Sequence, residues 1–245
     1  MLGDGLMEIE FRRLKNNKNG VLAILSCILC FILGYFLLIT LDGYTFAQIS
    51  LSQLQYSIYT VFSQFGFFIF PVLSIYLISS DYKDANIAFY QTLGKTATSY
   101  YINKIISLTI FISIGNLISA IFISLLYKDF SNLFLFVLKI ENVSIFIVFI
   151  SSLCAFIFKN TITAFCVNFG IWILSIVLSS IHNFFKVLCF YDASLSRHSE
   201  FEQILNTYNS FDISILIEVS YNIIILLIVI LIIKLLNKRW IKNGI

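Results

Sequence analysis

Few residues in this sequence have the type and spacing for chemistry, and the first to test is a possible nucleotide site. Gly94, Lys95 and Thr96 match the end of the phosphate-binding loop G-x-x-x-x-G-K-[ST]. That loop also needs a glycine five positions before Gly94, where this sequence has Phe89. Since the backbone cannot form the full phosphate cradle, we expect no ATP or other cofactor on this chain.

Histidine and cysteine patterns give no metal or catalytic site either. His182 and His198 lie in one polar segment without further ligands close by, whereas a zinc site normally needs three or four protein ligands. Cys27 and Cys30 form a C-x-x-C inside an apolar run, with no His or acid nearby. Neither H-E-x-x-H nor G-x-S-x-G occurs. We therefore expect no metal and no catalytic residue.

A second class of candidates is polar side chains inside long apolar runs. Such residues either line a transport path or hydrogen-bond between helices, and both interpretations stay open here. The neutral candidates for a translocation path are Gln64, Asn116, Asn168 and Asn222. Glu218 is the one acid assigned to a run, near its outer end, which argues against a proton-driven carrier with several buried acids.

The elements that hold these residues follow from composition. The chain is 59% hydrophobic and 12% charged, with a mean hydropathy of +0.93, whereas soluble domains carry about 25% charged residues. In a bilayer only helices or closed barrels satisfy the backbone, and runs such as Ile223–Leu231 do not alternate as barrel strands do. We predict an all-α membrane protein with a single transmembrane domain over residues 1–245.

Apolar runs about 20 residues long can cross the hydrocarbon core, and the sequence has six candidates. A short helix over Glu8–Lys15 is expected to lie along the interface before the first one. Pro71 should bend the second span, either as a packing kink or as a gate. The fourth span is short, and the apolar stretch Leu133–Leu138 could extend it. The predicted spans are Val21–Thr40, Tyr56–Ile78, Ile106–Tyr127, Val143–Phe158, Ile162–Ile181 and Ile213–Leu236.

Positive charge predicts the orientation, because cytoplasmic segments of membrane proteins are enriched in Lys and Arg. Six spans put both termini on one side. The proposed inner segments hold Arg12, Arg13, Lys15, Lys18, Lys83, Lys95, Lys104, Lys159, Lys234, Lys238, Arg239 and Lys242. The outer segments hold only Lys128, Lys139, Lys186 and Arg197. We predict that both termini lie in the cytoplasm, in a plasma membrane.

The longest polar interruption in the first two thirds of the chain, Ser79–Ile105, is predicted to be a cytoplasmic loop with an amphipathic helix over Asp81–Leu93. Gly94 should end this helix. One face is expected to settle on the membrane or on other helices: Tyr82, Ala85, Ala88, Phe89 and Leu93. The opposite face mixes charge, an aromatic and an aliphatic: Lys83, Asp84, Ile87, Tyr90 and Gln91. The helix is thus either an interfacial helix or a contact surface for a soluble partner.

The order of residues around this loop resembles a known family. After the second span come an acidic and basic stretch, a turn, an apolar helix, a break in that helix, and a lysine just before the third span. The residues at these places are Asp81, Lys83, Asp84, Asn86, Ile87, Leu93, Gly94, Thr96 and Lys104. In this and in its whole layout the chain resembles the membrane subunit of ABC-2 type ABC transporters, especially small bacterial permeases for bacteriocins, lantibiotics and other antimicrobial peptides. It departs from the family at Asn86, Gly94 and Ala97, where glycine, proline and a basic residue are usual.

The resemblance implies a partner that hydrolyses ATP. Two permeases, identical or paralogous, would pair, and each would dock on a cytoplasmic ATPase that binds ATP and Mg. The cargo would be a hydrophobic or amphipathic peptide, moved for export or self-immunity, and no nucleic acid is involved. The docking residues implied are Asp81, Lys83, Asp84, Asn86, Ile87, Tyr90, Gln91, Gly94 and Lys104. The alternatives are a secondary carrier, a membrane sensor subunit or an intramembrane enzyme.

Overall fold

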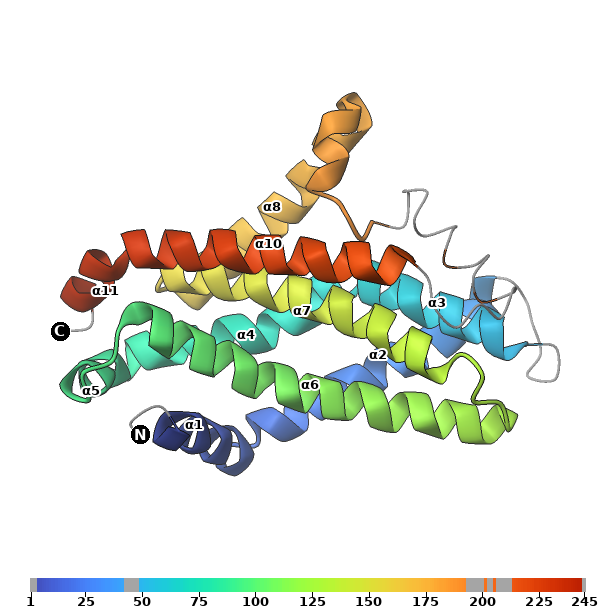
Figure 1. The fold of residues 1–245 in the computed structure, drawn as a ribbon, viewed down its shortest axis with the longest axis horizontal. Coiled ribbons are helices and arrows are strands. Elements are labelled where there is room, and N and C mark those ends of the chain that lie inside the picture. The colour runs from blue at the N-terminus through green and yellow to red at the C-terminus, as the bar shows by residue number, and fades with distance from the viewer. Residues whose placement is uncertain (1–3, 42–48, 193–200, 202–204, 206–212, 244–245) are drawn as a thin grey trace.

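The computed structural model describes residues 4–41, 49–192, 201, 205 and 213–243, and its regular elements are all helical (Figure 1). They are α1 (Asp4–Asn16), α2 (Asn19–Leu41), α3 (Leu51–Gln64), α4 (Gly66–Lys83), α5 (Asn86–Thr92), α6 (Ala97–Tyr127), α7 (Leu133–Ile157), α8 (Thr161–Ile181), the 3-10 helix η2 (Asn183–Val187), α10 (Ile213–Leu235) and α11 (Asn237–Asn243).

Five helices, α2, α6, α7, α8 and α10, are long and apolar enough to cross a membrane. α3 and α4 pass the same test together and form a sixth span if the pair is counted as one. The structure therefore supports a helical, multi-pass membrane protein. α7 begins at Leu133, so the apolar stretch before the predicted fourth span does extend it.

The second span is broken, but not where the proline predicted. α3 and α4 meet at an angle of 51° around Phe65 and Gly66, while Pro71 lies inside α4. A Cβ on Gly66 would lie 3.0 Å from Ile147 Cδ1 of α7, so the glycine lets the bend pack closely on that helix. The break lies five residues before Pro71, close to the turn that a proline weakens, so the second span is bent near but not at the proline.

α6 is longer than its predicted span and begins nine residues earlier than Ile106, at Ala97. Its 31 residues extend over about 47 Å, well beyond a hydrocarbon core of about 30 Å. The first turns of α6 therefore project beyond the membrane, next to α5. Figure 1 shows α1, α5 and α11 gathered at this end of the bundle, where both chain termini lie. We call it the termini end.

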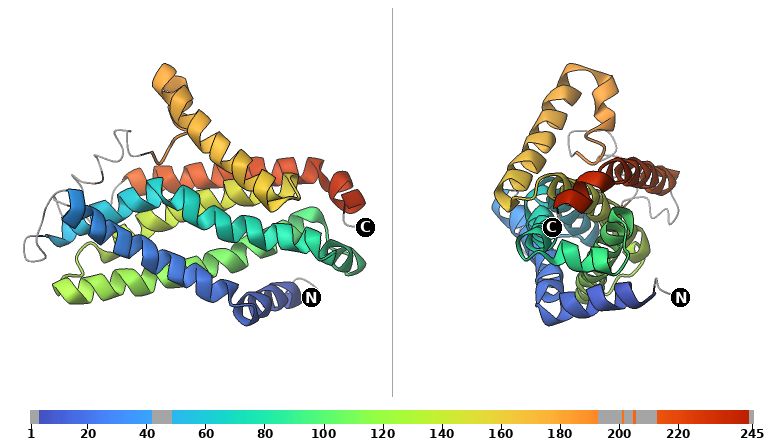
Figure 2. Two further views of the ribbon diagram at one scale, coloured as in Figure 1. Left: turned by 180° about the vertical axis from the view of Figure 1, so that it is seen from behind. Right: turned by 90° about the vertical axis from the view of Figure 1, so that its left-hand side faces the viewer.

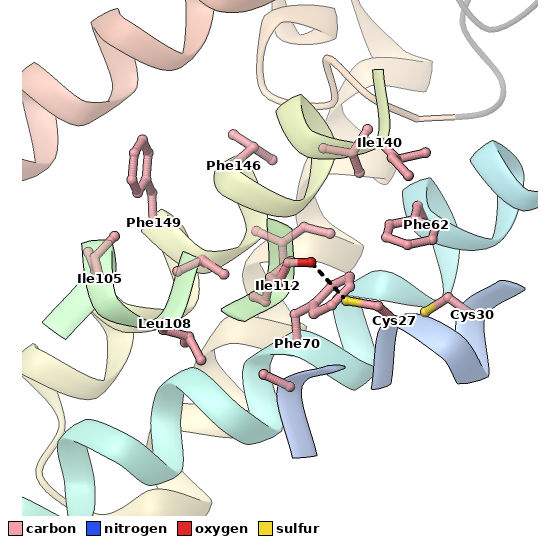
Figure 3. Close-up of a cluster of buried hydrophobic side chains, with 14 of the residues drawn as sticks. Cys27, Cys30, Phe62, Phe70, Ile105, Leu108, Ile112, Ile140, Phe146 and Phe149 are labelled. Atoms are coloured by element: carbon pink, nitrogen blue, oxygen red, sulfur yellow. Dashed lines mark hydrogen bonds between the residues drawn. The ribbon is translucent and has the colours of Figure 1, made fainter. Parts of the chain in front are cut away.

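α7 lies at the centre of the bundle and α8 at its margin. Two thirds (67%) of the most apolar stretch of α7 is buried, against 17% for α8. Figures 1 and 2 show α8 diverging from the other long helices toward its C-terminal end. The core beside α7 contains Cys27 and Cys30 among aromatic and aliphatic side chains, and the Cys27 thiol donates to the Ile112 carbonyl oxygen at 3.5 Å (Figure 3). These cysteines are packing residues of the core.

Candidate functional site

The predicted loop helix is two helices with a sharp turn between them. α4 continues through Asp81 to Lys83, and α5 begins at Asn86. Ala85, between them, has a φ of 55°, a left-handed conformation that residues other than glycine seldom adopt. Gly94, with a φ of 69°, then turns the chain toward α6. The prediction of one continuous helix over Asp81–Leu93 is therefore wrong, because the backbone reverses at Ala85.

After the turn, four residues of the loop lie opposite to their predicted faces. Ile87 and Tyr90, expected to point outward toward a partner, are 0% and 3% exposed. Phe89 and Leu93, expected to be packed, are 55% and 45% exposed. The predicted contact surface is wrong in this respect, because the turn at Ala85 rotates α5 relative to α4.

Four charged side chains lie beneath α5 and form what we call the four-charge cluster: Glu10, Arg13, Asp81 and Lys104. Lys104 Nζ lies 2.7 Å from Glu10 Oε2 and 2.7 Å from Asp81 Oδ2, and Arg13 Nη1 lies 2.6 Å from Asp81 Oδ1. Glu10, Asp81 and Lys104 are each at most 1% exposed. The two acids and two bases balance each other, which buried charges require. The cluster joins α1, α4 and α6.

Hydrogen bonds attach α5 to this cluster. The Tyr90 hydroxyl donates to Glu10 Oε1, and Asn86 Nδ2 donates to Asp81 Oδ1 at 3.2 Å. From α6, the Tyr100 hydroxyl donates to Asp81 Oδ2 at 2.9 Å. Burial and the negative charge of Glu10 raise the pKa of Tyr90, so its hydroxyl stays protonated and remains a donor. Any movement of α5 must therefore move the cluster or break these bonds.

The sequence analysis missed Glu10 and Arg13. The Glu8–Lys15 helix was predicted to lie along the interface with Ile9, Phe11 and Leu14 pointing inward. Leu14 is buried and Phe11 packs against the core, but Ile9 is exposed and Glu10 is buried. A usable signal was present, since Glu10, Arg13 and Leu14 lie three and four residues apart and share one helix face. Leu14 is buried on that same face.

The C-terminal helix α11 closes the site from the other side. Gln91 Nε2 of α5 donates to the Ile241 carbonyl oxygen at 3.1 Å. The Ala97 amide, at the start of α6, donates to Asn237 Oδ1 at 3.2 Å. Trp240 is buried, and its ring lies 5.7 Å from that of Tyr100. The basic tail therefore packs onto the loop, an arrangement that no sequence pattern predicted.

The remaining predicted docking residues lie at the surface of this site. Lys83 and Asp84 are exposed at the turn between α4 and α5, and Gly94 is exposed after α5. The structure thus divides the predicted docking set in two. Part of it is exposed, and the rest is buried or half-buried: Asp81, Asn86, Ile87, Tyr90, Gln91 and Lys104.

A second set of polar side chains, which we call the α7 polar cluster, consists of two hydrogen-bonded groups on α7: Glu141 with Ser113 and Asn116 of α6, and Lys139 and Asn142 with Glu218 and Asn222 of α10. Lys139 Nζ of α7 lies 2.6 Å from Glu218 Oε1 of α10, and both side chains are buried. Asn222 Nδ2 donates to the Asn142 carbonyl oxygen at 3.0 Å. Glu218, predicted near the outer end of its span, is buried against α7 through its pairing with Lys139.

Glu141 is the other acid of the α7 polar cluster. The Ser113 hydroxyl donates to its Oε2 at 2.9 Å, and Asn116 Nδ2 donates to its Oε1 at 3.1 Å. Asn116, a predicted path residue, thus holds a carboxylate between α6 and α7. Lys139 and Glu141 were assigned to a loop, since the predicted fourth span began at Val143. Extending the span back to Leu133 would have brought both charges into the helix.

The two other predicted path residues lie toward α8. Gln64 Nε2 donates to Asp192 Oδ2 at 3.3 Å. Asn168 of α8 is buried, and its Nδ2 has no hydrogen-bond partner within the part of the chain that the structure describes. The predicted path residues therefore do not converge on one site: Asn116 and Asn222 belong to the α7 polar cluster, while Gln64 and Asn168 lie elsewhere.

Comparison with known proteins adds the following. Residues 7–245 match the model of a family described as the peptide export permease protein YydJ family. The chain is 30% identical over 249 residues to the probable peptide export permease protein YydJ of Bacillus subtilis (strain 168), an alignment that covers 97% of this chain and 100% of the relative. No solved structure matches the chain.

Proposed function

Since the chain belongs to the peptide export permease family YydJ, a membership that fits the resemblance to ABC-2 type permeases, we propose that it is the membrane subunit of an ATP-driven peptide exporter. The ATPase is a separate chain, because this sequence has Phe89 at the position where a phosphate-binding loop needs a glycine. The permease works as a pair, with a second copy or a paralogue. Its cargo is a hydrophobic or amphipathic peptide of antimicrobial type, moved for export or self-immunity.

The observation that carries this proposal is an exposed surface on α5 and the turns beside it, which we call the α5 outer face: Lys83 at the end of α4, Asp84 in the turn, Phe89 of α5 and Leu93 just after it. Phe89 and Leu93 are four residues apart and form one apolar patch, flanked by a charge of each sign. An exposed aromatic and aliphatic pair within a polar rim is typical of a protein contact. We assign ATPase docking to this face.

The buried residues of the loop take a different role in this proposal. Tyr90 and Asn86 connect α5 to the four-charge cluster, and the cluster reaches α1, α4 and α6. A shift of α5 caused by nucleotide binding in the ATPase would therefore be passed to three further helices. The ATPase must bind the shifted arrangement better than the resting one for this coupling to work.

We further propose a plasma membrane location with the termini end in the cytoplasm. Basic residues are concentrated there, on α1, α11 and the α4–α5 turn, as cytoplasmic segments require. The α5 outer face lies at that same end and so would meet a cytoplasmic ATPase. The variants Lys95→Cys and Ser131→Cys test this orientation. A thiol reagent that cannot cross the membrane, added from outside, should label Ser131→Cys and leave Lys95→Cys unlabelled.

The docking proposal is tested by co-purification. The chain is expressed with a tagged ATPase encoded by a neighbouring reading frame, and the double variant Phe89→Asp, Leu93→Asp is compared with the wild type. Introduced carboxylates would be desolvated without a partner, so ATPase recovery should fall by about tenfold or more. The matched control is Ile241→Asp on α11, since Ile241 is 45% exposed at the same end. Normal ATPase recovery with the double variant would contradict docking on this face.

One observation favours the alternative, a proton-driven secondary carrier. The α7 polar cluster places Lys139, Glu141 and Glu218 inside the bundle, more ionisable groups than the sequence analysis assigned there. Such groups mark proton pathways in many carriers. Peptide uptake by vesicles that contain only this chain, driven by an imposed proton gradient, would establish the carrier; uptake that needs the ATPase and ATP would exclude it.

A further inference from the structure

A cavity of about 260 Å³ lies between α4, α7, α8 and α10, closed at one side by the segment after α8. Aromatic rings form much of its wall: Phe67, Phe146, Trp172, Tyr191 and Tyr221. The Phe67 and Trp172 rings stack at 5.7 Å, and the Phe146 ring lies 5.6 Å from that of Tyr221. Its volume is near the lower limit of known ligand sites, about 300 Å³, so it suits one or two side chains.

The cavity exists because α8 diverges from the bundle. α8 packs on α4 and α7 near its start and then leaves the other long helices (Figures 1 and 2). Leu174 and Leu178 of α8 line the cavity on one side, and Ile225 of α10 lines it on the other. Both helices are long and apolar enough to cross a membrane, so a ligand that passes between them comes from within the membrane.

One polar group stands out in this apolar wall. Asn168 lines the cavity, is 2% exposed, and its Nδ2 meets no acceptor among the described residues. A buried amide without a partner costs about 1–3 kcal/mol, which a bound acceptor would recover. The Tyr191 hydroxyl is a second group of this wall that is buried without a partner among the described residues. The cavity thus combines an aromatic wall with two unsatisfied hydrogen-bonding groups, of which Asn168 lies within α8.

The depth of Asn168 selects the kind of ligand. It lies seven residues from Thr161, about 10 Å along the helix from the nearer end of α8. The acyl chains that fill this depth of a bilayer have no acceptor, and the ester carbonyls of a phospholipid lie at the interface. A peptide unit supplies both an acceptor and a donor, and so can pair with the Asn168 amide in either orientation.

We propose that this cavity is a cargo-binding site, which takes an aromatic or branched aliphatic side chain of the exported peptide and pairs its peptide group with Asn168. The side chain lies against Trp172 and Tyr221, and the cargo enters laterally between α8 and α10. This inference rests on the proposed function, because it assumes that the cargo is a peptide.

The first step of the test identifies the cargo. Peptides in the culture medium are compared between cells with and without this chain, the rest of the export system being present in both. A peptide released only with the chain becomes the probe for the next step. If no peptide depends on the chain, the proposed function is overturned and this inference with it.

The second step locates the peptide by photo-crosslinking in the intact transporter. The photoreactive residue p-benzoylphenylalanine replaces Ile171, which lines the cavity, or Ile173, two residues further along α8 and outside the lining. These positions are 45% and 41% exposed and so are matched in access. We expect the adduct at Ile171 to contain the identified peptide and the adduct at Ile173 to contain only lipid.

The role of Asn168 is tested in the same experiment. Asn168→Leu keeps the volume and removes the donor, so peptide adducts at Ile171 should fall by about tenfold. ATPase recovery and protein yield serve as controls for folding. Adducts of phospholipid alone at Ile171, equal peptide adducts at Ile173, or unchanged peptide adducts in Asn168→Leu would each overturn this inference and leave peptide export intact.

Discussion

The two polar regions inside the bundle are built differently. The four-charge cluster has equal numbers of acids and bases, and two of its members, Asp81 and Lys104, each contact two opposite charges. The α7 polar cluster has one ion pair, Lys139 with Glu218, and a further acid, Glu141, whose two hydrogen bonds come from neutral side chains. Three ion pairs cross-link the first, while most of the bonds in the second involve neutral side chains.

This difference fits the place of each region in the proposed mechanism. The four-charge cluster joins α1, α4 and α6 under α5. A stiff connection there would make these three helices move together with α5. The α7 polar cluster joins α7 to α6 and to α10 inside the bundle, where helices in a transporter must rearrange. Hydrogen bonds between neutral side chains are weaker than ion pairs, and weaker bonds allow a second arrangement of nearly equal free energy.

The largest expected effect comes from the centre of the four-charge cluster. Lys104→Met removes the one base that contacts both buried acids, and breaking a buried ion pair costs about 3–5 kcal/mol. The free energy of unfolding of the detergent-solubilised chain should fall by that amount, as measured by thermal or denaturant unfolding. The control is Ile106→Met on the exposed side of α6, expected within about 0.5 kcal/mol of wild type. Equal stability of the two variants would refute the cross-linked cluster.

A somewhat smaller effect is expected in the α7 polar cluster. Lys139→Met leaves Glu218 buried without its cation and should cost about 3 kcal/mol. The double variant Lys139→Met, Glu218→Met should recover most of that loss, because an apolar pair replaces the ion pair. The single variant Glu218→Met completes the cycle, and the unfolding free energies of the wild type and the three variants give the coupling energy. If the double variant is no more stable than Lys139→Met, the pair does not act as an isolated unit and the contrast with the four-charge cluster fails.

The smallest effect concerns the link from α5 to its cluster. Tyr90→Phe keeps the ring and removes one hydrogen bond to a carboxylate, at a cost of about 1.5–3 kcal/mol. The ATPase should still co-purify, since Tyr90 is buried, but ATP hydrolysis should no longer respond to the peptide. A variant that loses the ATPase instead would mean that Tyr90 touches the partner, as the sequence first suggested.

Hydropathy predicted the spans well because each apolar run is long and its composition decides its solvent. It also indicated that α7 could begin at Leu133. Boundaries next to polar residues were harder: the fourth span was started at Val143, so Lys139 and Glu141 were assigned to a loop. From sequence alone, a charged residue usually indicates that a span has ended, because a charge inside the membrane needs an opposite charge beside it. The partner of Lys139 is on α10, far away in the sequence.

The polar pairings could not be predicted, because they join residues far apart in the chain. Glu10 and Lys104 have no shared pattern, and neither residue type indicates burial when taken alone. Which side of α5 is buried depends on the left-handed backbone conformation of Ala85. Alanine seldom adopts that conformation, so the sequence gives no sign of it. Amphipathic periodicity was therefore applied across a break that the sequence does not show.

The packing of α11 on α5 and α6 has a practical consequence for anyone who isolates this protein. Trp240 is buried only a few residues from the C-terminus, and α1 brings the N-terminus to the same end of the bundle. An affinity tag or a fluorescent protein fused to either terminus would crowd the surface where the ATPase is proposed to dock. Inserting such a label in the turn between α6 and α7, around Phe130, would place it at the far end and leave that surface accessible.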